Sequence, residues 1–225
     1  EAVLGGERGC RTVQQLGGEV LVGVLADLHH RRVGAGAQAL DLLPGEVAVR
    51  GQVVLLRGEA GIGKSRLVQV LQDHVAAEPQ AWLTPCQCSP YHQHTALYPL
   101  IDLLERVALR FDREESPQQK VGKLEGFLVQ YGLPLAEAVP LLAAVLSLPL
   151  PADYAPLAES SEQQKQRTLQ TFLTLLGRLA AQQPLLFVME DLHWADPSTL
   201  ELLSLFVAQG PTVRILALWT FRPDF

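Results

Sequence analysis

The sequence predicts an α/β fold built on an open parallel β-sheet. Short apolar runs, typical of strands buried on both faces of a sheet, lie at residues 53–56 and 185–189, and a third strand pattern lies at 213–220. Amphipathic helical patterns separate these runs. No hairpin turn signal joins them, so neighbouring strands should run parallel and be connected by right-handed crossovers.

The composition indicates a globular protein and disfavours two classes of partner. The 225 residues suffice for one large domain or at most two, and 48% apolar against 19% charged residues excludes a disordered chain. The net charge of -6 opposes approach to a phosphate backbone, so no direct binding of nucleic acid is expected. The uncharged, apolar stretch at residues 138–152 contains three prolines and is too short to cross a membrane.

The first residues and the cysteines indicate whether the chain is part of a longer protein and in which compartment it lies. The first residues, Glu-Ala-Val-Leu, include no initiator Met and no signal peptide, so we expect a piece of a longer protein. Three cysteines in a chain that needs no disulfides indicate a reducing compartment, and we expect a cytoplasmic location. Residues 1–50 show no sustained period and stay unassigned, whereas residues 51–225 are expected to form the folded core.

The first expected unit of the core is a strand, a glycine loop and a helix. The apolar run from Val53 ends at Gly58. Leu67, Leu71 and Val75 then repeat at i, i+4 and i+8, which predicts a helix from about residue 64 to 76. This order is the opening of a βαβ unit.

A long helical region follows a second expected strand at residues 81–84. Its first helix begins at Pro99, a favourable first position, and its second ends at Gly132. The last and longest helix begins with a capping box at Ser160 or Ser161. The four helices are expected over residues 99–108, 120–131, 135–146 with an interruption at Pro140, and from 160 or 161 to Pro184.

The remaining elements complete the alternation. After the strand at residues 185–189, Asp196 and Pro197 supply the N-cap and first residue of a helix that Gly210 ends. The strand at 213–220 is the last element expected.

The segment GEAGIGKS fits the phosphate-binding pattern G-x-x-x-x-G-K-[ST] and lies between a buried strand and an amphipathic helix, as that chemistry requires. The glycines let backbone N–H groups approach phosphates, the lysine reaches the β- and γ-phosphates, and the serine hydroxyl can bind Mg²⁺. This context disfavours a simple glycine-rich turn with a surface lysine. We expect nucleotide contacts from Gly58, Glu59, Ala60, Gly61, Ile62, Gly63, Lys64, Ser65 and Arg66.

Two acids follow the second apolar run, where a Walker B strand would end. Glu190 and Asp191 are expected to hold Mg²⁺ together with Ser65, directly or through water, and to orient or deprotonate the attacking water. By position the first acid should hold the metal and the second should act on the water. Because Glu precedes Asp, the reverse of the commoner order, the division of roles stays open, and one acid acting only as a helix cap is the alternative.

Three further residues lie close to these acids along the expected sheet edge. Arg222 follows the last strand, where its guanidinium would reach the γ-phosphate, and it is a third catalytic candidate. The alternative is that Arg222 forms an ion pair on the surface. Asp196 is expected to be a helix N-cap. His193 either lines the same crevice or shapes the turn.

With these motifs in place, residues 52–225 closely resemble the AAA-type, Orc1-like ATPase module of the STAND group of P-loop NTPases in bacterial signalling proteins. The resemblance rests on GEAGIGKSRLV, CQCSPYHQHTALYPLIDLLER, LPLAEAVPLLAAVLSLPLP and, above all, MEDLHWADPSTLELL followed by TFRPDF. It implies a three-layer αβα fold that binds ATP or ADP with Mg²⁺ and has a long helical insert before the Walker B strand. It also implies that the P-loop strand lies beside the Arg222 strand, followed by the Walker B strand and the strand near Trp82.

The resemblance also implies partners outside these residues. Such modules stand beside nucleotide cyclase domains, the closest branch, or in regulators that end in a helix-turn-helix, with tetratricopeptide-like repeats behind them. Fused output and repeat domains are therefore implied. The family's G-R-E segment has only a loose match at Gly6-Glu7-Arg8, too far upstream, so the adenine pocket is not assigned.

The chain ends soon after the Arg222 strand, so the fifth strand, helical lid and winged helix of the family are expected to be missing. If so, the strand at 53–56 is an uncovered edge unless the N-terminal 50 residues fold over it, and we expect self-association into a homo-oligomer and slow ATP turnover.

The leading functional hypothesis is an ATP-binding and hydrolysing switch. The alternative is a nucleotide-binding regulatory scaffold with negligible turnover. A small-molecule kinase is disfavoured, because the helical region shows no acceptor-site base distinct from Glu190 and Asp191.

Overall fold

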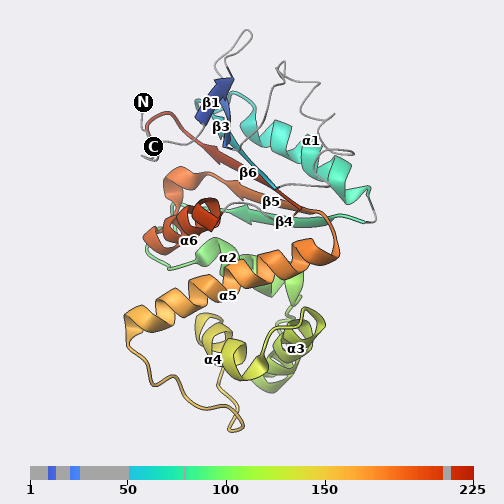
Figure 1. Cartoon of the computed structure of the whole chain (residues 1–225), viewed down its shortest axis with the longest axis vertical. Helices are drawn as coiled ribbons and strands as arrows, with labels where there is room; N and C mark the ends of the chain where they lie inside the picture. The colour runs from blue at the N-terminus through green and yellow to red at the C-terminus, as the bar shows by residue number, and fades with distance from the viewer. Residues whose placement is uncertain (1–9, 14–20, 26–50, 79, 210–213) are drawn as a thin grey trace.

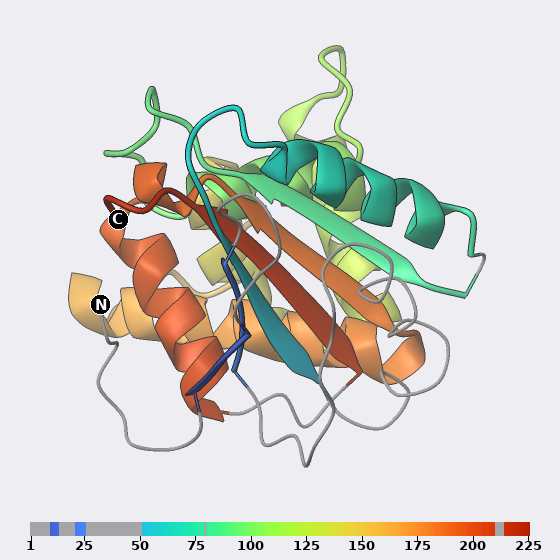
Figure 2. The same ribbon diagram turned by 90° about the horizontal axis from the view of Figure 1, so that it is seen from above.

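A computed structural model describes residues 10–13, 21–25, 51–78, 80–209 and 214–225, which form a six-stranded sheet with helices on both faces (Figures 1 and 2). The strand order is β1-β2-β3-β6-β5-β4. The strands are β1 (Cys10–Val13), β2 (Leu21–Leu25), β3 (Gln52–Arg57), β4 (Trp82–Gln87), β5 (Leu185–Glu190) and β6 (Ile215–Phe221).

The strands β3, β6, β5 and β4 run parallel and lie in the order that the resemblance implied. Their register aligns the carboxyl ends, since Arg57 in β3 pairs with Phe221 in β6, and Gln87 in β4 pairs with Glu190 in β5. The parallel sheet is thus confirmed for these strands. The segments that follow them all leave from one edge of the sheet.

The strands β1 and β2 correct two expectations. Both run antiparallel to their neighbours, and β2 pairs with β3 from Leu25 beside Val53 to Leu21 beside Arg57. The sheet is therefore mixed, and the edge of β3, expected to be uncovered unless the N-terminal 50 residues fold over it, is hydrogen-bonded to a strand from those residues. An unpaired edge exposes N–H and C=O groups that need partners. Residues 21–25, a short apolar run within an N-terminal segment that shows no sustained period, supply those partners, which removes the argument for self-association through this edge.

The helices are α1 (Lys64–Ala76) after β3, then α2 (Tyr98–Leu103), a π-helical turn (Leu104–Ala108), α3 (Pro117–Gln130), α4 (Leu135–Val145) and α5 (Ser161–Gln182) between β4 and β5. A short 3₁₀ turn (Leu192–Trp194) and α6 (Pro197–Gln209) lie between β5 and β6. No helix in the described ranges combines the length and apolar character that crossing a membrane requires.

The sheet is covered by α1 on one face and by α2, α5 and α6 on the other, with α3 and α4 beyond α5 (Figure 1). The alternation of side chains along β5 explains why both faces are covered. Leu186 and Val188 join Val68 of α1 in one cluster. Phe187 points to the opposite face, where its ring lies 5.8 Å from that of Phe206 in α6. A strand buried on both faces is apolar throughout, as the sequence pattern indicated.

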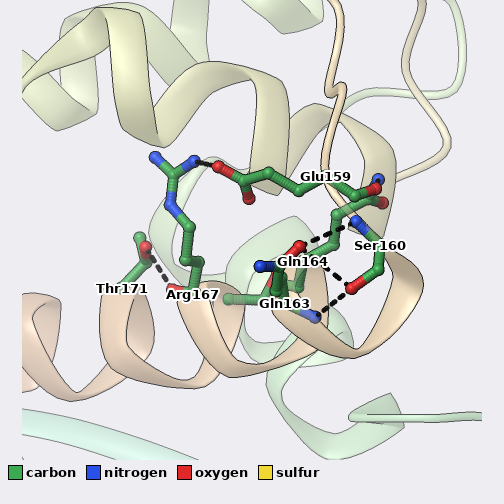
Figure 3. A network of polar contacts seen from close by, with 7 residues as sticks. Glu159, Ser160, Gln163, Gln164, Arg167 and Thr171 are labelled. Atoms are coloured by element: carbon green, nitrogen blue, oxygen red, sulfur yellow. Dashed lines mark hydrogen bonds and ion pairs between the residues drawn. The ribbon is translucent and has the colours of Figure 1, made fainter.

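Capping boxes begin the two longest helices. In α5 the Ser160 hydroxyl accepts from the Gln163 backbone N–H at 3.3 Å, while the Gln163 side chain accepts from the Ser160 backbone N–H (Figure 3). Of the two candidate serines, Ser160 is therefore the cap. The same arrangement of Ser116 and Gln119 begins α3, three residues before the expected start.

The helix α4 runs through Pro140, so the expected interruption was wrong. A proline inside a helix removes the hydrogen bond to the carbonyl four residues earlier and disfavours the helix. Here Pro140 is itself buried, beside the fully buried Val139 and Leu142. Burial of this apolar helix outweighs the missing hydrogen bond.

Candidate functional site

The loop between β3 and α1, residues 58–63, has the backbone that its glycines predict. Gly61 and Gly63 adopt φ values of 80° and 102°, in the left-handed region that favours glycine. Beyond the adjoining residues, no atom of the described part of the chain lies within 4 Å of where a Cβ would stand at either glycine, so the constraint is conformational. Within the described ranges no side chain caps the N-terminus of α1, and no acidic residue lies in its first turn. Its backbone N–H groups are thus available to an anion.

Lys64, the first residue of α1, directly follows this loop and is only 8% exposed. Its Nζ donates to the carbonyl oxygens of Gly58 at 2.6 Å and Glu59 at 2.9 Å. None of the ion pairs among the described residues includes it. A buried ammonium that bonds only to neutral carbonyls keeps a charge that an anion can neutralise. Together with the free N–H groups of α1, this donor set fits the phosphates of a nucleotide.

Ser65 and Glu190 come from separate elements and lie close together. Glu190 is half-buried at the end of β5. Burial raises the pKa of Glu190, and the nearby Asp191 carboxylate raises it further. A hydrogen bond with the Ser65 hydroxyl opposes this rise. A hydroxyl and a carboxylate beside a phosphate-binding loop are the oxygen ligands that Mg²⁺ prefers. These two residues fit the metal that the family implies.

Asp191 is oriented differently from its neighbour. Its backbone has a positive φ of 58°, and its N–H donates to the Thr220 hydroxyl of β6 at 3.0 Å. Its carboxylate lies 3.5 Å from the side-chain nitrogen of Gln87 at the end of β4. Glu190 therefore faces the P-loop, whereas Asp191 faces the neighbouring strand on the other side.

Arg222 lies between the P-loop and the turn after β5. The residues on either side of it are tethered to the end of β3: the Phe221 carbonyl accepts from Gly58 N–H at 3.3 Å, and the Pro223 carbonyl accepts from the Arg57 guanidinium at 2.9 Å. The Arg222 guanidinium lies over the Trp194 ring, 5.8 Å from its centroid. Among the described residues Arg222 makes no ion pair, so the surface ion-pair alternative has no support there.

Asp196 is the N-cap of α6, as expected, and has a second role. Its Oδ1 accepts from the backbone N–H groups of Ser198 at 2.9 Å and Thr199 at 3.0 Å. The same oxygen accepts from the N–H of Leu97 at 3.1 Å, at the start of α2. Asp196 thus ties the turn after β5 to the turn after β4.

The sequence interpretation missed Arg57, Thr220 and Trp194. One signal was available for Thr220, a polar residue in an otherwise apolar strand pattern, where it is 1% exposed and bonds to Asp191. Arg57 and Trp194 contact residues far away in the sequence, and no spacing indicates those contacts. The Gly6-Glu7-Arg8 segment lies outside the described residues.

Comparison with known proteins agrees with this geometry. Residues 37–218 match the family model described as the AAA ATPase domain, which includes the P-loop, Glu190 and Asp191 but not Arg222. An uncharacterized protein from Rhizobium meliloti (strain 1021) is 26% identical over 190 residues, which cover 82% of this chain and 18% of that protein. The chain thus spans less than a fifth of the length of this relative. The matched model covers most of the sequence, and the chain belongs to the AAA ATPase domain family.

Proposed function

We propose that this chain is an ATP-binding and hydrolysing switch domain. The observation that carries the proposal is the buried Lys64 ammonium, held by two loop carbonyls in front of the free N-terminus of α1. An AAA ATPase domain is a nucleotide-binding and hydrolysing module, and this loop is the part of the chain whose charge and shape suit phosphates.

The residues around the loop suggest a division of roles. Lys64 and the loop N–H groups would bind the β- and γ-phosphates, and Ser65 with Glu190 would hold Mg²⁺. The chemistry supplied by Mg²⁺ at such a site is neutralisation of charge on those phosphates. Asp191, which faces away from Ser65, would orient the water that attacks the γ-phosphorus, and the bond to the β-phosphate oxygen would break to give ADP and phosphate. Arg222 would contact the γ-phosphate.

The finer assignment is also a proposal. We place the domain in the STAND group, within a larger signalling protein that carries a cyclase or helix-turn-helix output domain and repeats. The motifs around the Walker B acids support this, as does the much greater length of the Rhizobium relative. A cytoplasmic location is supported by the free, buried thiols of Cys86 and Cys88. Slow turnover and homo-oligomerisation stay predictions.

The binding proposal is tested with Lys64→Ala. Loss of the fixed cation should abolish measurable affinity for Mg·ATP and Mg·ADP by titration calorimetry, while the circular dichroism spectrum stays unchanged. A matched control is Lys165→Ala, because that lysine pairs with Glu201 away from the loop. An unchanged dissociation constant for Lys64→Ala would remove the P-loop assignment.

Turnover separates the switch from the scaffold alternative. The switch requires steady-state phosphate release by the wild-type chain above that of a Glu190→Gln, Asp191→Asn double variant. Binding of Mg·ATP without such a difference would favour a regulatory scaffold whose state depends on the bound nucleotide alone.

A further inference from the structure

Thr220 places a hydroxyl in a strand that is otherwise apolar. It is 1% exposed, and every other residue of β6 is apolar. A hydroxyl loses its hydrogen bonds to water when it is buried, so valine, which has the same shape, would suit the core of the sheet better. The presence of threonine is therefore explained by the hydrogen-bond partner of its hydroxyl rather than by packing.

That partner is the backbone of Asp191, at the point where the chain leaves the sheet. The pairing of β5 with β6 extends to Met189 beside Trp219. The Thr220 hydroxyl, one residue further along β6, accepts from the N–H of Asp191 at 3.0 Å. A side chain thus continues the connection between the two strands past the last of their backbone pairs.

Asp191 has a backbone conformation that residues with a Cβ rarely adopt. Its φ of 58° and ψ of 46° lie in the left-handed region, which persists only where the surroundings hold it. The Thr220 hydroxyl binds its N–H, and the Trp194 N–H donates to its carbonyl oxygen at 2.8 Å, so the residue is held on both sides. His193, in the same turn, has both ring nitrogens shielded from solvent, which favours the turn-shaping role among the two expected for it.

The Asp191 carboxylate is held less firmly than its backbone. Among the described residues, its hydrogen-bond partner is the Gln87 side chain at 3.5 Å, which is long for a hydrogen bond. The position of the carboxylate therefore depends mainly on the backbone that carries it. A displacement of a catalytic group by about 1 Å can lower a rate about 100-fold.

We propose that Thr220 is a positioning residue for ATP hydrolysis: its hydroxyl fixes the backbone of Asp191, and thereby the carboxylate that orients the attacking water. The inference rests on the proposed function and adds to it a residue that acts only through Asp191. Loss of the hydroxyl should therefore slow hydrolysis without weakening nucleotide binding, because the phosphate-binding loop belongs to β3 and α1.

The competing explanation is a purely structural role for a buried hydroxyl. Thr84 provides the matched control, because it is 5% exposed in β4 and its hydroxyl donates to the Leu186 carbonyl of β5 at 3.2 Å. Thr84→Val also removes a buried hydroxyl that joins neighbouring strands, but it leaves the partner of Asp191 in place. A structural role predicts that the two valine variants hydrolyse ATP alike, whereas a positioning role predicts a slower rate for Thr220→Val alone.

The test measures kcat and KM for phosphate release from Mg·ATP, and Kd for Mg·ADP, with the 225-residue chain. Thr220→Val should lower kcat about 10- to 100-fold and change KM and Kd by less than about threefold. Thr220→Ser retains the hydroxyl and should recover most of the rate. Thr84→Val should leave all three constants within about twofold of the wild type.

A second measurement shows whether Thr220 acts through Asp191. In an Asp191→Ala chain no carboxylate remains to be positioned, so adding Thr220→Val should lower the residual rate by less than about twofold. The rate is measured in a single turnover with protein in excess over ATP. Two independent roles would instead multiply the separate losses.

Each outcome decides between the possibilities. Hydrolysis at the wild-type rate by Thr220→Val, a parallel loss of nucleotide affinity, or multiplied losses in the double variant would overturn the inference and leave the proposed function standing. A wild-type chain without turnover above that of the Glu190→Gln, Asp191→Asn variant would overturn both. If thermal unfolding shows that Thr220→Val does not fold, Thr220→Ala against Thr220→Ser gives the same comparison, since these two differ by the hydroxyl alone.

Discussion

Replacement of Asp196 by alanine should lower the free energy of unfolding by about 2–4 kcal/mol. Asp196 is 2% exposed and accepts three backbone N–H groups through one oxygen. Its other oxygen accepts from the hydroxyl of Thr199, which is fully buried. Alanine removes all of these acceptors and provides none.

The magnitude has two parts. Loss of the N-cap of α6 costs about 1 kcal/mol, as for an N-cap elsewhere. The N–H of Leu97, a buried residue, loses its partner, and an unsatisfied buried donor costs about 1–3 kcal/mol. Ser160→Ala is the matched control, because Ser160 caps α5 at an exposed position and, among the residues that the structure describes, bonds only within its own helix. It should cost about 1 kcal/mol.

The assay is urea denaturation of the wild type and the two alanine variants at one pH, with Asp196→Asn as a further variant. Asparagine caps helices as well as aspartate does and retains an oxygen acceptor, so Asp196→Asn should lower the free energy of unfolding by no more than about 1 kcal/mol. An Asp196→Ala variant no less stable than Ser160→Ala, with equal m values, would refute the tie between the turns after β4 and β5.

Three further predictions concern the site and the backbone. Glu190→Gln should raise the Mg²⁺ concentration required for ATP turnover, whereas Asp191→Asn should lower turnover by at least about 100-fold at saturating Mg²⁺, as measured by phosphate release; equal effects would contradict the division of roles. Gly63→Ala should destabilise the chain by about 1–2 kcal/mol, because Gly63 has a positive φ. Gly126→Ala, in α3 with equally open space around the new Cβ, should stabilise the chain by about 0.5–1 kcal/mol. Chemical denaturation would show whether the two changes in the free energy of unfolding have opposite signs. Burial raises the pKa of Cys88 to about 12, so at pH 8 Cys88 should be alkylated only after unfolding. Mass spectrometry that finds Cys88 alkylated in the native chain would contradict this.

Local signals in the sequence predicted much of the fold. The β3–loop–α1 unit and the cap at Asp196 depend on residues close together in the chain, so their spacing is informative. The order of the parallel strands came from the resemblance rather than from the residues themselves. The strand β2 was missed although its residues, LVGVL, form a short apolar run, because nothing in that run indicates an antiparallel partner far along the chain.

In the candidate site, too, the sequence indicated individual residues but not the contacts between distant segments. The sequence placed Ser65, Glu190 and Arg222 as candidates, and the structure brings Ser65 beside Glu190 and places Arg222 over the turn after β5. Thr220 stood out as a polar residue in an apolar strand pattern, but nothing in the sequence indicated that its partner would be the Asp191 backbone or that Asp196 would reach Leu97. These are hydrogen bonds between distant segments, and they depend on a register that only the folded sheet defines.

The unequal covering of the two sheet faces has a consequence for local opening. Among the described residues, α1 buries only Lys64, Val68 and Val75, whereas α5 on the opposite face buries eight side chains. Segments with few buried apolar contacts open at a lower free energy than the whole molecule, so α1 should exchange its amide hydrogens through partial unfolding before α5 does. A ligand held at the start of α1 would stabilise the segment that opens most readily, and would raise the free energy of that local opening by an amount that grows with the ratio of the ligand concentration to the dissociation constant.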